Sequence, residues 1–150
     1  MFAEMMEENI SSLRVASDLG NLEVIRKFVE QGAKESGLSE DGVSGLRLAV
    51  DEACANIIMH GYRELSGDIE ITITAGADQI QVALEDWAPS FNPLKRASGR
   101  DFDKPLDQRA LGGMGVFLIR DNTDSAEYQL RDDGGNRLIL TCLLQPRVAD

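Results

Sequence analysis

Residues 39–61 read SEDGVSGLRLAVDEACANIIMHG and carry the pattern that decides the fold. Ser39, followed by two acidic residues, has the form of a helix N-cap with negative charge in the first turn. Apolar residues then recur at helical spacing, at Leu46, Val50, Ala53, Cys54 and Ile57. The pattern predicts a helix that runs to about His60, stops at Gly61 and turns one face toward a core.

Working outward from this helix, alternating and helical patterns follow one another on both sides. In chain order they predict an edge strand at 11–16, a helix from 22 to between 32 and 37, strands at 69–73 and 80–84, a short helix after 115, and a hairpin with strands at 126–130 and 138–142. This order predicts an α/β sandwich, in which a mixed, mostly antiparallel sheet is covered on one face by helices.

The composition excludes several classes of protein. The 150 residues include 15 Lys and Arg against 26 Asp and Glu, a formal net charge of −11, which disfavours direct binding to nucleic acid or to an anionic membrane. No apolar run approaches the roughly 20 residues of a membrane helix, and the acidic start is unlike a signal peptide. Cys54 and Cys142 lie in apolar surroundings and are interpreted as reduced core thiols. We therefore expect a cytoplasmic protein whose residues 1–150 form one domain.

Glu52 and Asn56 are the first unusual feature of the central helix. They lie four residues apart, so they project from the same side, and Gly45, Leu48 and Met59 share their face. One interpretation is a partly exposed polar edge. The other is a cleft in which Glu52 is a general base and Asn56 a metal or hydrogen-bond ligand. The helix pattern alone leaves both open.

Asp86 is the second unusual feature. It continues the alternation of the strand at 80–84, so its carboxylate is expected on the buried face of that strand. A buried carboxylate needs a hydrogen-bond partner. That partner is either a neighbouring backbone amide, in a structural role, or a donor on a ligand, such as an exocyclic amine.

The segment Gly112-Gly113-Met114-Gly115 stands directly before an apolar helix. Glycine permits close approach of the backbone, and a helix N-terminus presents free amides to an anion. The same cluster also suits a flexible hinge. The segment lacks the Gly-Lys-Ser/Thr ending of a P-loop.

The segment 92–111 has no periodic pattern and is long for a connection inside one domain, which is typical of a lid. Its basic residues are Lys95, Arg96, Arg100, Lys104 and Arg109, opposed by three aspartates. A solvated loop explains this charge, but positive charge beside a glycine-rich anion site also suits polyphosphate. Taken together, the four features describe a nucleotide site.

Three segments in the same order resemble the sequence boxes of the GHKL ATPase superfamily, and specifically its anti-sigma-factor serine/threonine kinases. Residues 50–62 (VDEACANIIMHGY) are similar to the asparagine box, 86–93 (DWAPSFNP) to the first glycine box, and 112–120 (GGMGVFLIR) to the second. The resemblance extends from about 22 to 144 and implies a Bergerat-type ATP-binding fold.

The resemblance also implies cofactors, ATP and Mg²⁺, and a role for each site residue. Asn56 would coordinate Mg²⁺ at the phosphates, Glu52 would be the catalytic base, and Asp86 would accept a hydrogen bond from the adenine amino group. The phosphates would be held by Gly112, Gly113, Met114 and Gly115, chiefly through backbone amides, with Arg109 reaching the γ-phosphate. Such roles suit phosphoryl transfer.

The function implied is that of a Mg-ATP-dependent protein serine/threonine kinase that acts as an anti-sigma factor. It would bind a sigma factor in one state, phosphorylate a STAS-domain antagonist in the other, and form a homodimer. His60, the only histidine, is interpreted as a structural residue at the helix end.

Three residues depart from the family pattern. Asn92 replaces an aspartate and Asn136 a threonine, while Ala88 replaces the glycine beside the adenine aspartate. The Cβ of Ala88 would stand where the base or an ordered water approaches. This departure motivates an alternative: a catalytically silent module that binds nucleotide, or ignores it, and only switches between partners.

Overall fold

A computed structural model describes residues 9–95 and 113–144. Its helices are η1 (Leu19–Asn21), α2 (Leu22–Ser36), α3 (Glu40–Asn56), η2 (Ile57–Tyr62), η3 (Pro93–Lys95) and α4 (Gly113–Asp121). Its strands are β1 (Asn9–Ala16), β2 (Asp68–Ala75), β3 (Gln79–Asp86), β4 (Ser125–Leu130) and β5 (Asn136–Leu143). Each element predicted from the sequence is present.

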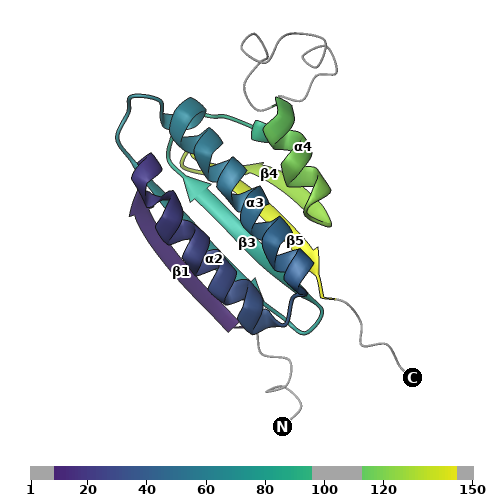
Figure 1. Cartoon of the computed structure of the whole chain (residues 1–150). Coiled ribbons are helices and arrows are strands. Elements are labelled where there is room, and N and C mark those ends of the chain that lie inside the picture. Colours follow the sequence, from purple (N-terminus) through teal and green to yellow (C-terminus); the bar gives the residue numbers. More distant parts are fainter. Residues whose placement is uncertain (1–8, 96–112, 145–150) are drawn as a thin grey trace, which may run out of the picture.

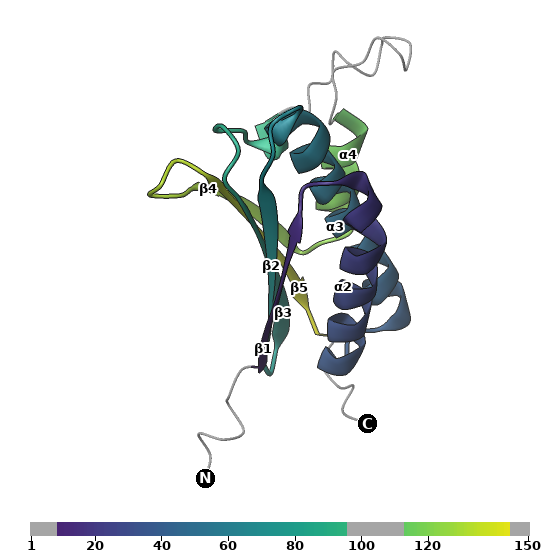
Figure 2. The same ribbon diagram turned by 90° about the vertical axis from the view of Figure 1, so that its left-hand side faces the viewer.

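The strands form one sheet in the order β1-β2-β3-β5-β4. All four pairings are antiparallel, so the sheet has no parallel pair where the sequence prediction allowed a mixed one. The three long helices α2, α3 and α4 lie on one face of this sheet, as Figures 1 and 2 show from two sides. The predicted sandwich with helices on one face is confirmed.

The core lies between the sheet and α3. Alternate residues of β2 and β3 are buried there, as is the apolar stripe of α3, including Leu46 and Val50. Burial of each such side chain contributes about 1.5–3 kcal/mol to folding. Gly32 lets α2 approach the sheet, because a Cβ at that position would lie 2.7 Å from Cδ1 of Ile73.

The ends of the helices follow local chemistry. Ser39 caps α3 by accepting a hydrogen bond from the amide of Gly42, as predicted. Beyond Asn56 the chain continues to Tyr62 with the wider winding of a π-helix, rather than ending as one α-helix near His60. The helix α4 begins at Gly113, three residues before the predicted start after Gly115, so Gly113 and Gly115 lie in its first turn.

Both cysteines are buried, and burial raises the pKa of each thiol, that of Cys142 to about 11. This agrees with their interpretation as core thiols. Within residues 9–95 and 113–144, none of the helices is long and apolar enough to cross a membrane.

Candidate functional site

The first turn of α4 packs against the polar face of α3. A Cβ added to Gly115 would lie 3.2 Å from Oε2 of Glu52 and 3.3 Å from Nδ2 of Asn56. Any larger residue at 115 would therefore crowd both side chains. The structure brings together the carboxylate, the amide and one of the glycines that the sequence singled out.

The polar groups of this cluster are held in a partly dry environment. Asn56 is 7% exposed, and its Nδ2 has no hydrogen bond among the described residues. Partial burial, and then the charge of Asp51, raise the pKa of Glu52. A buried amide nitrogen without a hydrogen bond and a carboxylate with a raised pKa both lower the stability of the fold. Groups of this kind are frequent at functional sites.

This cluster offers a divalent cation only part of a coordination shell. The described residues include no group of three or more His, Cys, Asp or Glu side chains able to hold a metal ion. Mg²⁺, however, keeps several waters and is commonly bound through one or two protein oxygens together with substrate phosphates. The amide oxygen of Asn56 fits that arrangement, and Nδ2 of the same amide can donate to a phosphate oxygen.

Asp86 lies at the end of β3 with its carboxylate buried, 3% exposed, as predicted. Its Oδ1 accepts from the amide of Ala88 at 3.0 Å and from Nδ2 of Asn136 at 2.8 Å. Oδ2 accepts none of the hydrogen bonds recorded in the described part of the chain. Burial raises the pKa of Asp86, against the opposing effect of these two hydrogen bonds. The structural partner expected for Asp86 is present, and one oxygen is left for a ligand.

Asn136 holds the loop that follows Asp86. Its Nδ2 also lies 3.3 Å from the carbonyl oxygens of Ala88 and Pro89. Its Oδ1 accepts from the amide of Phe91 at 2.9 Å and from the hydroxyl of Tyr128. One buried side chain therefore ties β5 and β4 to the whole loop, although the sequence marked it only as a departure from the family pattern.

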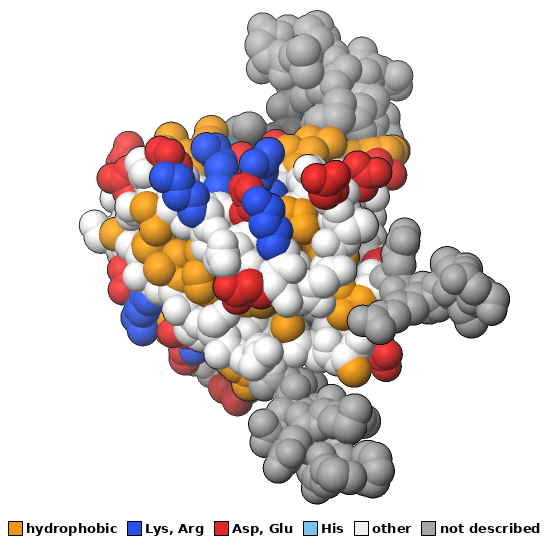
Figure 3. Space-filling model, turned by 60° about the horizontal axis from the view of Figure 1, so that its bottom comes forward, with side chains coloured by type: hydrophobic (Ala, Val, Ile, Leu, Met, Phe, Trp, Pro, Cys, Tyr) orange, Lys and Arg blue, Asp and Glu red, His pale blue; other side chains and the backbone are white. Residues whose placement is uncertain are grey.

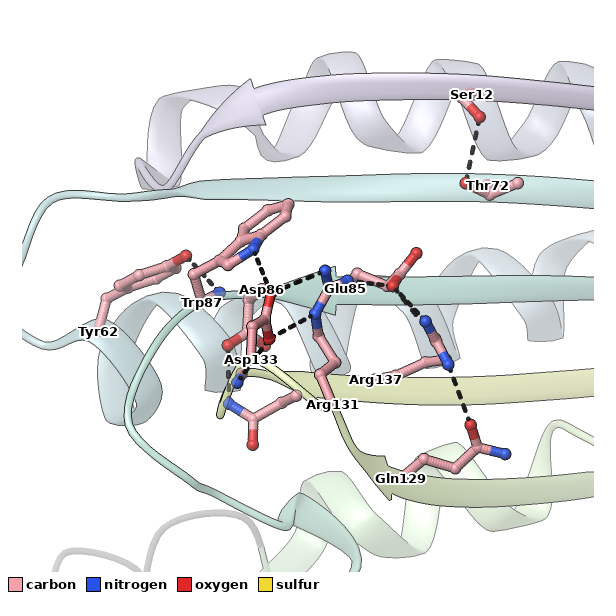
Figure 4. A network of polar contacts seen from close by, with 12 residues as sticks. Ser12, Tyr62, Thr72, Glu85, Asp86, Trp87, Gln129, Arg131, Asp133 and Arg137 are labelled. Atoms are coloured by element: carbon pink, nitrogen blue, oxygen red, sulfur yellow. Dashed lines mark hydrogen bonds and ion pairs between the residues drawn. The ribbon is translucent and has the colours of Figure 1, made fainter.

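Trp87 supports the same loop from the outer face of the sheet (Figure 4). Its ring lies between two guanidinium groups, with Arg14 at 4.4 Å and Arg131 at 4.8 Å from the ring centroid. Its Nε1 donates to Asp133 at 3.1 Å, and its backbone amide donates to the hydroxyl of Tyr62 at 2.8 Å. Asp86 and Trp87 thus point to opposite faces, and both are fixed.

Ala88, the departure in the first glycine box, packs against the end of the central helix. The residue is buried, and its Cβ lies 3.5 Å from where a Cβ of Gly61 would stand, so the methyl group packs against η2. Its backbone amide still donates to Oδ1 of Asp86. The methyl group therefore fills a gap between the loop and η2.

The remaining predicted site residues are placed only in part. The backbones of Gly113 and Met114 lie in the first turn of α4. Arg109 and Gly112 lie outside the described residues, as does 96–111 of the proposed lid. His60 lies in η2 at the end of α3, in agreement with a place at the helix end.

Sequence reasoning missed the groups that fix the loop after Asp86. Tyr62 directly follows the predicted helix, and Trp87 directly follows an inward carboxylate. Gly135 is a third: a Cβ there would collide with the carbonyl oxygen of Asp86. The sequence signal for Gly135 was the glycine pair at 134–135 in the last turn, because glycines permit a turn to lie close to another segment of backbone.

The surface charge is balanced locally despite the net negative charge. On the face shown in Figure 3, basic side chains stand beside acidic ones. Arg26 pairs with Asp51 at 2.7 Å, and Glu30 pairs with Lys34 at 2.9 Å.

Comparison with known proteins gives a consistent result. A family model described as a histidine kinase-like ATPase domain matches residues 15–142. The chain is 32% identical over 125 residues to the serine-protein kinase RsbW of Bacillus cereus (strain ATCC 10987). The aligned stretch covers 81% of this chain and 77% of that protein. The RsbW of Bacillus mycoides (strain KBAB4) is 31% identical over the same length.

Two solved structures share the fold. The RsbU and RsbW domains of Rv1364c from Mycobacterium tuberculosis match 91% of this chain, with a TM-score of 0.59 and 18% identity. The histidine kinase domain of Erythrobacter litoralis EL346 matches 84%, with a TM-score of 0.51 and 14% identity. The matches span 33% and 60% of those two chains.

Proposed function

Because the chain belongs to the histidine kinase-like ATPase domain family, we propose that it is a Mg-ATP-dependent protein serine/threonine kinase. The observation that carries this proposal is the closeness of Gly115 to Glu52 and Asn56, whose buried Nδ2 has no partner among the described residues. Asp86 stands buried at the end of the neighbouring strand β3 with one oxygen to spare. The relatives named above as serine-protein kinases support the same class of reaction.

Different residues bind different parts of the nucleotide. Asp86 orients the adenine base, because its Oδ2 accepts a hydrogen bond from the exocyclic amine of adenine. The amides in the first turn of α4, from Gly113 to Gly115, face the phosphates at the positive end of the helix. Asn56 contributes its amide oxygen to Mg²⁺. Arg109, from the proposed lid at 92–111, and Gly112, directly after it, complete the contacts to the phosphates.

Glu52 performs the catalytic step of this proposal. When bound, Mg-ATP supplies the phosphoryl group and neutralises the charge that develops on it. Glu52 accepts the proton of the attacking serine hydroxyl, or orients that hydroxyl by a hydrogen bond. Its raised pKa makes it a better proton acceptor than an ordinary surface carboxylate once it is ionised.

The partners are proposed on the same basis. We propose that the kinase is a cytoplasmic anti-sigma factor that binds a sigma factor in one state and phosphorylates a serine of a STAS-domain antagonist in the other. We further propose a homodimer, and a single domain over residues 1–150. The resemblance of the three sequence boxes to anti-sigma kinases supports this assignment.

Calorimetric titration of ATP and ADP, with and without Mg²⁺, tests the proposal. The wild type should bind both nucleotides, Asp86→Asn should lose affinity with or without Mg²⁺, and Asn56→Ala should lose only the Mg²⁺-dependent part. A wild type that binds no nucleotide at millimolar concentration would contradict the kinase. The chain would then be a module that only switches between partners, the alternative motivated by Ala88.

A further inference from the structure

A cavity of about 610 Å³ opens beside the candidate site, between η2 with the turn after it and the loop that follows β3. One wall is formed by residues 60–65 and the other by 89–91. The contact between Gly61 and Ala88 lies between these two walls. The polar side chains at the cavity include Arg63, Glu64 and Ser90.

Arg63 has an unfavourable backbone conformation at this cavity. Its φ of 57° and ψ of −113° make it the one non-glycine residue with positive φ in 9–95 and 113–144. The amide of Leu65 donates to the carbonyl of Tyr62 at 2.9 Å, so Arg63 is the first central residue of a type II′ turn. That position favours glycine, because a Cβ is strained there. Strain of this kind persists where a side chain serves a function.

The guanidinium group of Arg63 also has no counter-ion among the described residues. Five other arginines of the described chain form ion pairs or hydrogen bonds with acidic side chains: Arg14, Arg26, Arg47, Arg131 and Arg137. Arg63 is exposed and makes no ion pair with the described acidic residues, its neighbour Glu64 included. Arg120 on α4 likewise makes no ion pair with the described acidic residues, so Arg63 is distinguished by the combination of an unpaired guanidinium group with a strained backbone at this cavity.

We propose that Arg63 and Ser90 form a carboxylate-binding site that receives an acidic side chain of the protein substrate, next to its acceptor serine. A guanidinium binds a carboxylate through two parallel hydrogen bonds, and a hydroxyl can donate a third. The cavity is bounded by the loop after Asp86 and by the turn that follows η2, so a substrate docked there lies beside the nucleotide. The choice of a protein carboxylate rests on the proposed kinase function.

Two peptides with one serine each, one flanked by aspartates and the other by asparagines, test the site by NMR titration of the full chain without nucleotide. The aspartate peptide should bind about tenfold more tightly and shift the amides of Ser90 and Leu65. Arg63→Gly should remove the difference, Glu64→Gln should enlarge it, and Arg120→Ala, on α4, should leave it unchanged. Equal binding of the two peptides, or binding of neither, would overturn the proposal.

Thermal unfolding of the same variants tests the strain. Arg63→Gly should raise the unfolding midpoint by about 2–4 °C, whereas Arg63→Lys should not, because lysine retains the Cβ. A midpoint that falls for Arg63→Gly would show that the arginine serves the fold and would contradict the proposal. Since neither experiment uses nucleotide, a failure here is distinct from a failure of ATP binding, which would contradict the kinase.

Discussion

The two ends of the candidate site differ in how their polar groups are satisfied. At the loop after β3, Asp86 and Asn136 bond each other, and Asn136 bonds four further groups. At the contact between α3 and α4, Asn56 is equally buried, yet its Nδ2 has no partner among the described residues. At the Asp86 end the protein itself supplies most of the hydrogen bonds and leaves one carboxylate oxygen, whereas at the other end the buried amide nitrogen of Asn56 has no partner among the described residues.

This difference follows from what each end is proposed to bind. A planar base is recognised by a few fixed hydrogen bonds, so a rigid acceptor loses little entropy on binding. Phosphates and a hydrated cation bring their own oxygens, so protein groups that would otherwise bond each other must stay free. The comparison predicts that substitutions at the Asp86 end affect stability and affinity together, whereas those at the Glu52 end separate them.

The largest effect is expected for Glu52→Gln. Removing the base should lower the rate of phosphoryl transfer about 10²- to 10⁴-fold, while ATP affinity stays within about twofold. Glu23→Gln is the matched control, because it makes the same exchange on α2, where Glu23 is exposed and pairs with Lys27. Phosphoserine formation on a STAS-domain protein, followed by mass spectrometry, measures the rate. Transfer that persists in the Gln variant would remove the assigned role.

Asn136→Ala should be the most destabilising change in the site. It leaves the buried carboxylate of Asp86 with one hydrogen bond fewer and frees the loop, at a cost of about 2–4 kcal/mol in the free energy of unfolding. ATP affinity should fall as well. Asn92→Ala, which removes one hydrogen bond to the amide of Leu94, should cost about 1 kcal/mol or less. Urea unfolding measures both, and equal losses would mean that Asn136 does not organise the loop.

Asp86→Asn tests the electrostatic side of the same end. Burial raises the pKa of Asp86 in the folded protein, so its ionised form opposes folding at neutral pH. The contribution of Asp86 to stability should therefore grow as pH falls from 7 through the raised pKa toward the ordinary value near 4. Over the same interval ATP binding should weaken, because the protonated oxygen accepts less well.

Urea unfolding of the wild type and the Asn variant, at several pH values from 7.5 to 4.5, measures this contribution. The stability of the wild type relative to Asp86→Asn should rise toward acid. A difference that stays constant would mean that the carboxylate titrates as an exposed one, and the assignment of a buried acceptor would lose its basis.

Most of the fold could be predicted from local patterns, because each helix and strand has a hydrophobic periodicity of its own in the sequence. The alternation at 69–73 and 80–84 and the helical stripe around Val50 place the core without any knowledge of pairing. Strand order and the start of α4 depend on contacts between distant segments. Gly113 joins the helix because Gly115 packs on Glu52 and Asn56, and no signal near 113 reports that contact.

The candidate site was predictable where a residue type breaks its local pattern. Asp86 is a polar group at a position where the alternation predicts burial, and Asn56 is a polar group on a helix face that also carries apolar residues; both are buried. Asn136 and Trp87 break no local rule, since an asparagine after a turn and an aromatic residue after a strand are ordinary. Their partners lie about fifty residues away along the chain. The direction of the Ala88 methyl group likewise depends on Gly61, a tertiary contact.

The smallest effect is expected for Trp87→Phe, which separates the ring from its hydrogen bond. Phenylalanine retains a face for Arg14 and Arg131 but loses the bond from Nε1 to Asp133. The free energy of unfolding should fall by about 0.5–1.5 kcal/mol, with a small loss of ATP affinity. Trp87→Leu, which also loses the cation–π contacts, should cost more. If the two variants were equally stable, the contacts of the two guanidinium groups with the ring would contribute nothing to stability. The contribution of Trp87 to the loop would then come from the hydrogen bond that its backbone amide donates to the hydroxyl of Tyr62.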